Sequence, residues 1–302
     1  LGYMTFSSYV MFGLTHHLGR SKSRLFNSQF SFPGALKSGA LVRNIIHFAF
    51  GFEVAGILLL YPYFLFHDVA DPLWSAVFHS ISAFCTAGFS IWTDNLVRFQ
   101  TDYYVNIVIL LLSYMGAMGF IVMTDLWYKV TRRHHRITFT SKVIIGITFL
   151  LSLWSTLHLY FREPSLAVFA PGDRLMISLF QSVSAMTTVG FNTVEIGLMA
   201  PLSLLILTLA MYIGASPSGT GGGLKSTTLS AIYAYTKNKL GLHKDISLFG
   251  NIIPSYRVET AVTACLFYTF LFFAGIYFIV LFEAGRTGFL KIVFEVSSAL
   301  AT

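Results

Sequence analysis

Long apolar stretches alternate with short charged ones along this chain. Each of the clearest stretches holds at least the ~20 residues that a helix needs to cross a bilayer, and they lie at 43–66, 103–128, 142–161 and 258–282. Residues 1–14 have the character of the end of a further span. The pattern therefore predicts a polytopic membrane protein built from transmembrane helices.

One apolar stretch, 199–235, is too long for a simple span and is interrupted by a run of glycine and other small residues at 214–223. We expect two half-helices, 199–213 and 224–235, joined by a non-helical segment. Irregular backbone at membrane depth is tolerated only where protein buries it or where it lines a water-filled cavity. The run is therefore a candidate functional segment.

Composition supports the membrane class. Of the 302 residues, 55% are hydrophobic and 11% are charged, against about 25% charged in ordinary soluble proteins. These values exclude a disordered chain, a disulfide scaffold and a typical soluble enzyme. Cys85 and Cys265 lie far apart and give no disulfide or metal framework. Because the chain begins without Met and stops after an apolar stretch, we interpret it as a fragment of a longer protein.

The charged residues sort by sign into alternate loops. Of the 20 Lys and Arg residues, 14 lie in the segments 14–43, 128–142 and 237–257. Of the 13 acidic residues, 9 lie in the segments 67–102, 162–199 and 283–295. An excess of Lys and Arg in short loops marks the cytoplasmic side. The net charge of +7 thus reflects membrane topology, with the basic loops inside. The basic runs are not part of a folded basic domain, so they do not indicate a nucleic-acid partner.

The acidic loops share a repeated motif. Residues 78–90 read FHSISAFCTAGFS and align, at an offset of 102, with residues 180–192, which read FQSVSAMTTVGFN. A third copy, FEVSSALAT at residues 294–302, aligns with the first nine residues of the other two copies and lies 114 residues after the second. Repetition at such a period indicates one structural unit used several times. The unit is a span, a short amphipathic helix, Thr-x-Gly and a second span.

The short helix of each unit is too short to cross the membrane. The 13 residues 72–84 form about 20 Å of helix, against a hydrocarbon core of about 30 Å. The matching helix is expected at 174–186. We expect side-chain caps from Asp71, Asp173 and Thr287. A helix that enters from outside and ends within the membrane aims its negative C-terminal dipole at the centre, where it favours a cation.

The Thr-x-Gly segments that follow, 86–89 and 188–191, are predicted to be extended. Their carbonyls can replace the hydration shell of a cation, as in a potassium filter, and Gly permits the positive φ that this requires. A lone Thr-x-Gly is typical of a helix C-cap or turn, but two full copies and a third that stops at its Thr, all in the same context, favour a pore. The candidate ion-binding residues are Thr86, Ala87, Gly88, Thr188, Val189, Gly190 and Thr302.

These motifs resemble the Trk/Ktr/HKT family of potassium transporters. Residues 190–193, GFNT, are similar to the filter region of that family. The run 214–228, GASPSGTGGGLKSTT, resembles the intramembrane loop in the broken second helix of its third repeat. The resemblance covers the whole chain, and the loop is closer to Ktr-type than to Trk-type subunits.

The resemblance implies an all-α polytopic fold with pseudo-fourfold span–pore helix–span repeats around a central ion pore, incomplete at both ends. The end of repeat one would be 1–14, and the following repeats would be 43–128, 142–236 and the truncated 258–302. The family's gate loop, 214–224, with the neighbouring lysine, corresponds to Gly214, Ala215, Ser216, Pro217, Ser218, Gly219, Thr220, Gly221, Gly222, Gly223 and Lys225.

The resemblance also implies a function and partners. It implies potassium uptake across the plasma membrane, a homodimeric subunit in the lipid bilayer, and a cytoplasmic regulatory subunit that binds ATP or ADP. Potassium (K+) would be the substrate and no cofactor would be bound by this chain; coupling to sodium stays open. Lys225 is expected to repel potassium near the pathway, with extension to the cytoplasmic interface as the alternative.

Other classes fit less well. The run 219–226 nearly matches a phosphate-binding loop, but Leu224 stands where Gly should precede the Lys, and no βαβ context surrounds it. A membrane-embedded enzyme is a second alternative, but the sequence contains no HExxH or GxSxG motif. Cys85 could act as a nucleophile, but the sequence offers no intramembrane base to accompany it. A secondary transporter of sodium or another solute would explain the broken span but not the Thr-x-Gly copies.

Overall fold

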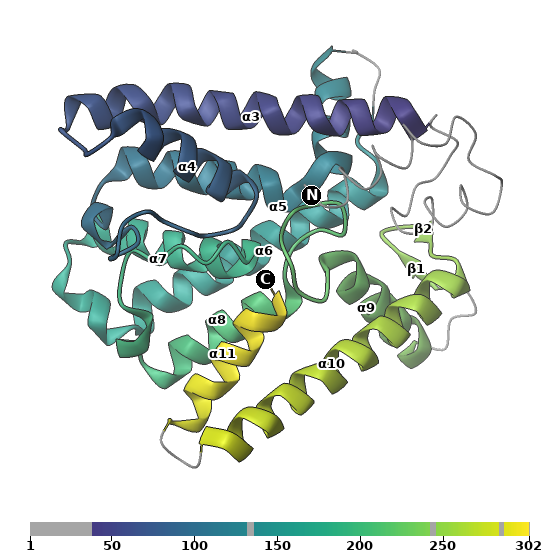
Figure 1. Cartoon of the computed structure of the whole chain (residues 1–302). Coiled ribbons are helices and arrows are strands. Elements are labelled where there is room, and N and C mark those ends of the chain that lie inside the picture. The colour runs from purple at the N-terminus through teal and green to yellow at the C-terminus, as the bar shows by residue number, and fades with distance from the viewer. Residues whose placement is uncertain (1–37, 132–135, 242–245, 284–286, 302) are drawn as a thin grey trace.

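The computed structural model describes residues 38–131, 136–241, 246–283 and 287–301 (Figure 1). The predicted end of repeat one at 1–14 and the filter residue Thr302 lie outside these residues. The helices of the first described repeat are α3 (Ser38–Phe66), α4 (Pro72–Phe84) and α5 (Tyr103–Thr131). Those of the next are α6 (Phe139–Arg162), α7 (Pro171–Thr187), α8 (Pro201–Ile213) and α9 (Ser226–Leu240). The last pair is α10 (Ser255–Glu283) and α11 (Phe289–Ala301).

Short elements occupy some of the connections. The 3₁₀ turns are η1 (Val97–Phe99), η2 (Pro164–Val168) and η3 (Ile196–Leu198). Strands β1 (Ser247–Leu248) and β2 (Asn251–Ile252) form an antiparallel hairpin between α9 and α10. The described part of the chain is therefore an all-α fold with one two-stranded hairpin, and the polytopic fold class is confirmed.

Four of the described helices are long and apolar enough to cross a membrane, and their spans are Ile45–Phe66, Tyr103–Thr131, Phe139–Arg162 and Ser255–Glu283. They match the four stretches predicted from hydropathy, because apolar length is the property that a bilayer selects. The long stretch after residue 199 is broken into α8 and α9, as expected. The second half-helix begins at Ser226 rather than at Leu224.

The short helices pack in the same way in successive repeats. Helix α4 contacts α3 and α5, and α7 contacts α6 and α8. Each later short helix also packs against the second span of the repeat before it, α7 against α5 and α11 against α8. Figure 1 shows α3 and α10 at opposite edges of the molecule, with α6 and α7 between them. The repeats are thus arranged in sequence by one recurring contact.

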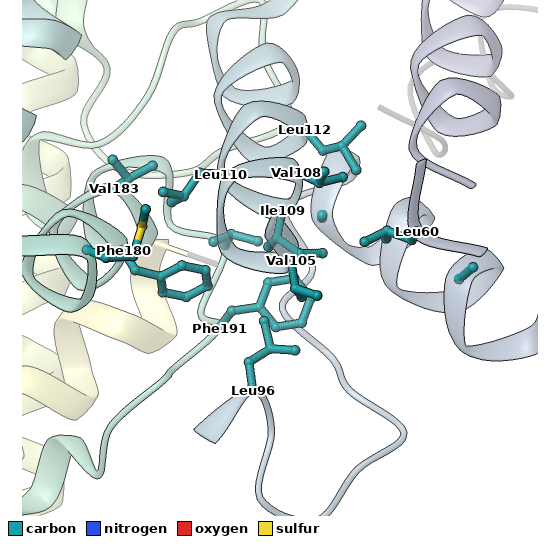
Figure 2. Packing of buried hydrophobic residues seen from close by; sticks show 14 of the residues in the cluster. Leu60, Leu96, Val105, Val108, Ile109, Leu110, Leu112, Phe180, Val183 and Phe191 are labelled. Atoms are coloured by element: carbon teal, nitrogen blue, oxygen red, sulfur yellow. The ribbon is translucent and has the colours of Figure 1, made fainter. Parts of the chain in front are cut away.

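The largest buried core joins two repeats. In Figure 2, Leu110 of α5 lies on the side of Phe180 and Val183 of α7, and Phe191 from the segment after α7 lies beside Leu96. Phe191 is 1% exposed, whereas its equivalent at the offset of 102, Phe89, is 69% exposed. The Gly-Phe of one repeat therefore inserts its ring into the core of the repeat before it.

The predicted side-chain caps of the short helices are wrong. Asp71 precedes α4 with φ 46° and makes no capping side-chain bond. Helix α7 begins at Pro171, three residues earlier than predicted, because proline is already suited to the first helical position. Asp173 therefore lies in the first turn and accepts a 3.0 Å bond from the Tyr103 hydroxyl. Thr287 donates to Glu283 and lies two residues before α11.

Candidate ion-conduction site

The two described Thr-x-Gly segments have the same unusual backbone. Thr86 and Thr188 have φ 51° and 58°, and Gly88 and Gly190 have φ 66° and 86°. The residue between each pair has no positive φ. The prediction of extended backbone is therefore wrong at both threonines, because Thr188 is the left-handed C-cap of α7 and Thr86 follows the C-cap of α4. Both segments leave their short helix through the same turn, in which the next N–H, of Ala87 or Val189, donates back to the carbonyl of Ser82 or Ser184.

The same hydrogen bond ties each segment to its short helix. The Ser82 hydroxyl donates to the carbonyl of Phe89 at 2.8 Å. The Ser184 hydroxyl donates to the carbonyl of Phe191 at 2.6 Å. Both serines and both phenylalanines are related by the offset of 102 residues. The repeat found in the sequence is therefore also a repeat of contacts.

The two segments approach one another closely at Gly88. A Cβ on Gly88 would lie 1.8 Å from the carbonyl oxygen of Val189, so no side chain fits there. A Cβ on Gly190 would meet no described atom within 4 Å. The glycine of the first described repeat thus lies directly against the backbone of the next.

The loop between α8 and α9, residues 214–225, passes under the ends of the short helices. Its Thr220 hydroxyl donates to the carbonyl of Phe84, the last residue of α4, at 3.1 Å. A Cβ on Gly221 would lie 2.5 Å from the carbonyl oxygen of Thr187, the last residue of α7. These carbonyls carry the negative ends of the two helix dipoles, so the loop lies where a cation is favoured.

Gly222 completes this contact on two further sides. A Cβ on Gly222 would lie 1.6 Å from the carbonyl oxygen of Ala301, the last residue of α11. Its N–H donates to the Thr188 hydroxyl at 2.7 Å. In Figure 1 the end of α11 reaches the centre of the molecule beside this loop. Glycine is needed at position 222 because the last residue of α11 leaves no room for a side chain.

A kink in α5 receives the other side of the loop. Gly119, with φ 74°, breaks the regular geometry of α5. A Cβ on Gly119 would lie 2.2 Å from the backbone of Ser218. Nearby, the N–H of Thr220 donates to the carbonyl of Gly116 at 3.0 Å. This contact between α5 and the loop was not predicted from the sequence. Its signal is the pair Gly116 and Gly119, three residues apart in a predicted span.

The side chain of Lys225 turns back toward the loop that precedes it. Its ammonium donates a 2.6 Å hydrogen bond to the carbonyl of Gly221. Its own backbone has φ 85°, at the residue before α9. The Lys225 side chain is therefore folded back onto the loop. Its ammonium group lies within the loop.

Carboxylates near the spans have protein partners. Glu53 accepts from the Cys85 thiol at 3.7 Å, so Cys85 is not simply an apolar packing residue. Asp125 accepts from the Thr138 hydroxyl at 2.5 Å and from the Ser141 hydroxyl at 2.6 Å. Within the described residues no group of three His, Cys, Asp or Glu side chains could hold a metal ion.

Comparison with known proteins gives consistent matches. The TrkH family of cation transport proteins matches residues 4–302. The chain is 30% identical to Ktr system potassium uptake protein B of Bacillus subtilis, over the whole chain and 68% of that protein. It is 28% identical to the protein of the same name from Vibrio alginolyticus, over the whole chain and 67% of that protein.

A solved structure supports the fold. The crystal structure of the potassium transporter TrkH from Vibrio parahaemolyticus matches with a TM-score of 0.71 at 19% identity, over 88% of this chain and 56% of that chain. The chain thus spans about two thirds of the two Ktr relatives and just over half of the solved chain. Both sequence relatives are Ktr proteins, as the loop predicted. Because the family match extends over nearly all of its residues, the chain belongs to the TrkH family of cation transport proteins.

Proposed function

We propose that this protein takes up potassium across the plasma membrane through a filter of Thr-x-Gly segments. The observation that carries the proposal is the shared backbone of 86–88 and 188–190, with left-handed φ at Thr and at Gly in both. The names of both Ktr relatives describe potassium uptake. In this proposal carbonyls of Thr86, Ala87, Gly88, Thr188, Val189 and Gly190 replace water around the ion, and Thr302 begins a further segment.

The loop at 214–225 is proposed to be the gate. Its backbone bonds to Thr188 and to the kink of α5, and its small residues fit closely under three helix ends. The Lys225 ammonium adds a positive charge that repels a cation leaving the filter. For ions to pass, the loop must leave this position, and its glycines permit the required backbone change.

We propose that the basic loops face the cytoplasm, as the Lys and Arg excess indicates. They would provide a docking surface for a cytoplasmic nucleotide-binding subunit, and the membrane subunit would act as a homodimer. The support is the loop charge pattern and the relatives, which are named as proteins of a Ktr system.

The test is transport by the full-length protein in cells that lack their own potassium uptake. We expect growth at low external potassium and saturable uptake of Rb⁺, a potassium substitute. A matched strain should express Gly190→Ser, whose added Cβ meets no described atom within 4 Å, and we expect it to discriminate less against sodium. Absence of growth with the unmodified protein in the membrane would refute the proposal. Growth or uptake that depends on sodium alone would instead support the sodium transporter.

A further inference from the structure

A polar side chain is buried behind the first described filter segment. His79, in the middle of α4, is fully buried. Its Nδ1 lies 2.8 Å from the carbonyl oxygen of Ser75, and its Nε2 lies 2.8 Å from the hydroxyl of Ser90. Ser90 comes two residues after Gly88. The histidine therefore connects the rigid helix to the chain that leaves the filter.

The partners define the direction of each bond. The Ser75 carbonyl can only accept, so Nδ1 carries the proton of the neutral ring. Nε2 then accepts from the Ser90 hydroxyl. The oxygen of that hydroxyl accepts from the N–H of Trp92 at 3.1 Å. Both ring nitrogens and the hydroxyl are thus satisfied, as buried polar groups usually are.

The ring of His79 is also held by aromatic neighbours. It stacks on Trp92 with centroids 4.0 Å apart and an interplanar angle of 20°. Phe64 of α3 meets it edge-on at 6.5 Å, and Phe191 lies at 6.2 Å. Phe191 belongs to the next filter segment. The site is therefore dry and rigid, and it touches both repeats.

A loop residue extends the connection to the filter carbonyls. The backbone carbonyl of Asn95 lies 3.4 Å from the Ser90 hydroxyl. The side-chain amide of Asn95 donates to the carbonyl of Gly88 at 3.4 Å. The amide oxygen of the same side chain accepts from the N–H of Asn192 at 3.4 Å. Asn95 thus connects the outer ends of the two filter segments, and it lies beside Ser90, the residue to which His79 bonds.

The second described repeat has an equivalent connection. Gln181 occupies the position of His79 at the offset of 102 and is 2% exposed. Its Nε2 donates to the Thr193 hydroxyl at 3.0 Å, and Thr193 is fully buried. Thr193 comes three residues after Gly190. Each short helix therefore ties the chain beyond its filter segment through one buried side chain.

We propose that His79 and Gln181 are positioning residues that set the ion selectivity of this filter. Neither contacts the ion; each holds the outer end of a filter segment so that the carbonyls keep the spacing of a dehydrated potassium ion. A filter released from this support would let its carbonyls approach a smaller ion, which weakens discrimination against sodium. The inference rests on the proposed potassium uptake.

The test compares variants of the full-length protein by the ratio of sodium to potassium transport and by the two apparent KM values. His79→Leu and Ser90→Ala each remove the bond, and we expect each to lower potassium-over-sodium discrimination about tenfold. His79→Gln installs the side chain that the next repeat uses and should keep discrimination within about twofold of the unmodified protein. The double variant His79→Leu/Ser90→Ala should be no worse than either single variant.

Unchanged discrimination in His79→Leu or Ser90→Ala would overturn the inference, as would a loss in His79→Gln equal to that in His79→Leu. If His79→Leu does not reach the membrane, Ser90→Ala decides, because it removes a single hydroxyl. Thr193→Val, of nearly the same shape as Thr, makes the same test in the second repeat. If the unmodified protein moves no potassium, the proposed function fails first, and that result is distinct from each of these.

Discussion

The backbone N–H of Gly222 donates a 2.7 Å hydrogen bond to the hydroxyl of Thr188 in the filter segment of the same repeat. Thr86 occupies the equivalent position in the other described segment and has a similar left-handed φ. Its hydroxyl instead donates to the carbonyl of Cys85 at 2.7 Å. Of these two equivalent threonines, Thr188 is therefore the one whose hydroxyl bonds to the loop at 214–225.

This asymmetry predicts that Thr188→Ala speeds uptake. The change removes the acceptor for the Gly222 N–H and leaves the Thr188 carbonyl in place, so the loop loses one bond to the filter. A net hydrogen bond contributes about 1 kcal/mol, which corresponds to about a fivefold change in the open population. The measurement is the initial rate of Rb⁺ uptake at equal amounts of protein in the membrane.

Two controls isolate the effect of the hydrogen bond between Gly222 and Thr188. Thr188→Ser retains the hydroxyl and should stay close to the unmodified rate. Thr86→Ala removes the equivalent hydroxyl, which does not contact the loop, and should not speed uptake. Equal acceleration by Thr86→Ala and Thr188→Ala would show that the filter itself, and not the loop, had changed.

The charge within the loop leads to a second prediction. Lys225→Met keeps the length of the side chain but removes both the ammonium and its bond to the Gly221 carbonyl. We expect faster potassium uptake and a weaker dependence on regulation, because repulsion below the filter is lost. Lys237→Met makes the same charge change at an exposed position in the last turn of α9. A similar acceleration by Lys237→Met would assign the effect to net charge instead.

The two filter glycines should respond differently to the same substitution. Gly190→Ser adds a side chain into space free of described atoms, at a φ of 86° that strains any side chain. We expect this protein to assemble and to lose discrimination against sodium. At Gly88 the same change places Cβ 1.8 Å from the Val189 carbonyl oxygen, so the two segments must separate.

For Gly88→Ser we therefore expect a lower yield of assembled protein and little uptake of either ion. Gly146→Ala serves as the control, because a Cβ there meets nothing within 4 Å and alanine favours a helix. Unchanged discrimination in an assembled Gly190→Ser protein would remove Gly190 from the filter.

The parts of the fold that were predictable depend on local properties of the chain. Apolar length gave the four spans, and the glycine run gave the break between α8 and α9. The Thr-x-Gly repeat predicted that residues 86–88 and 188–190 would share one conformation, and the same local sequence does produce the same positive φ at Thr86 and Thr188. These features need no knowledge of distant contacts.

The parts that were missed depend on contacts between distant segments. The kink at Gly119 exists because Ser218, about 100 residues away, packs against it. The direction of the Lys225 side chain depends on where the loop folds back, which hydropathy does not specify. The bond from His79 to Ser90 needs the filter to turn back along its own helix. Such pairings become visible only in three dimensions.

Glu163 joins the start of the second described repeat to its broken span. Its side chain is 1% exposed at the end of α6. One carboxylate oxygen accepts from the N–H of Ser165 and the other from the N–H of Ala200, the cap of α8, both at 3.0 Å. Burial alone raises the pKa of this carboxyl, but the hydrogen bonds together lower the pKa below the ordinary 4.5.

The sign of the pH dependence follows from this lowered pKa. The ionised form is bound more strongly in the folded protein, so its contribution to stability is fully present above about pH 4.5 and is lost as the pH falls through the lower folded pKa. Glu163→Gln keeps one acceptor oxygen and loses the other. We expect it to lower the free energy of unfolding by about 1–3 kcal/mol at neutral pH.

The measurement is thermal unfolding of the purified full-length protein in detergent, from about pH 6 to pH 3. The difference in melting temperature between the unmodified protein and Glu163→Gln should shrink across this interval, because protonation removes the same interaction that the substitution removes. Glu195→Gln, at an exposed position in the same outer loop region, should show no such convergence. Parallel curves for Glu163→Gln and the unmodified protein would mean that the Glu163 carboxylate does not hold α6 and α8 together through its charge.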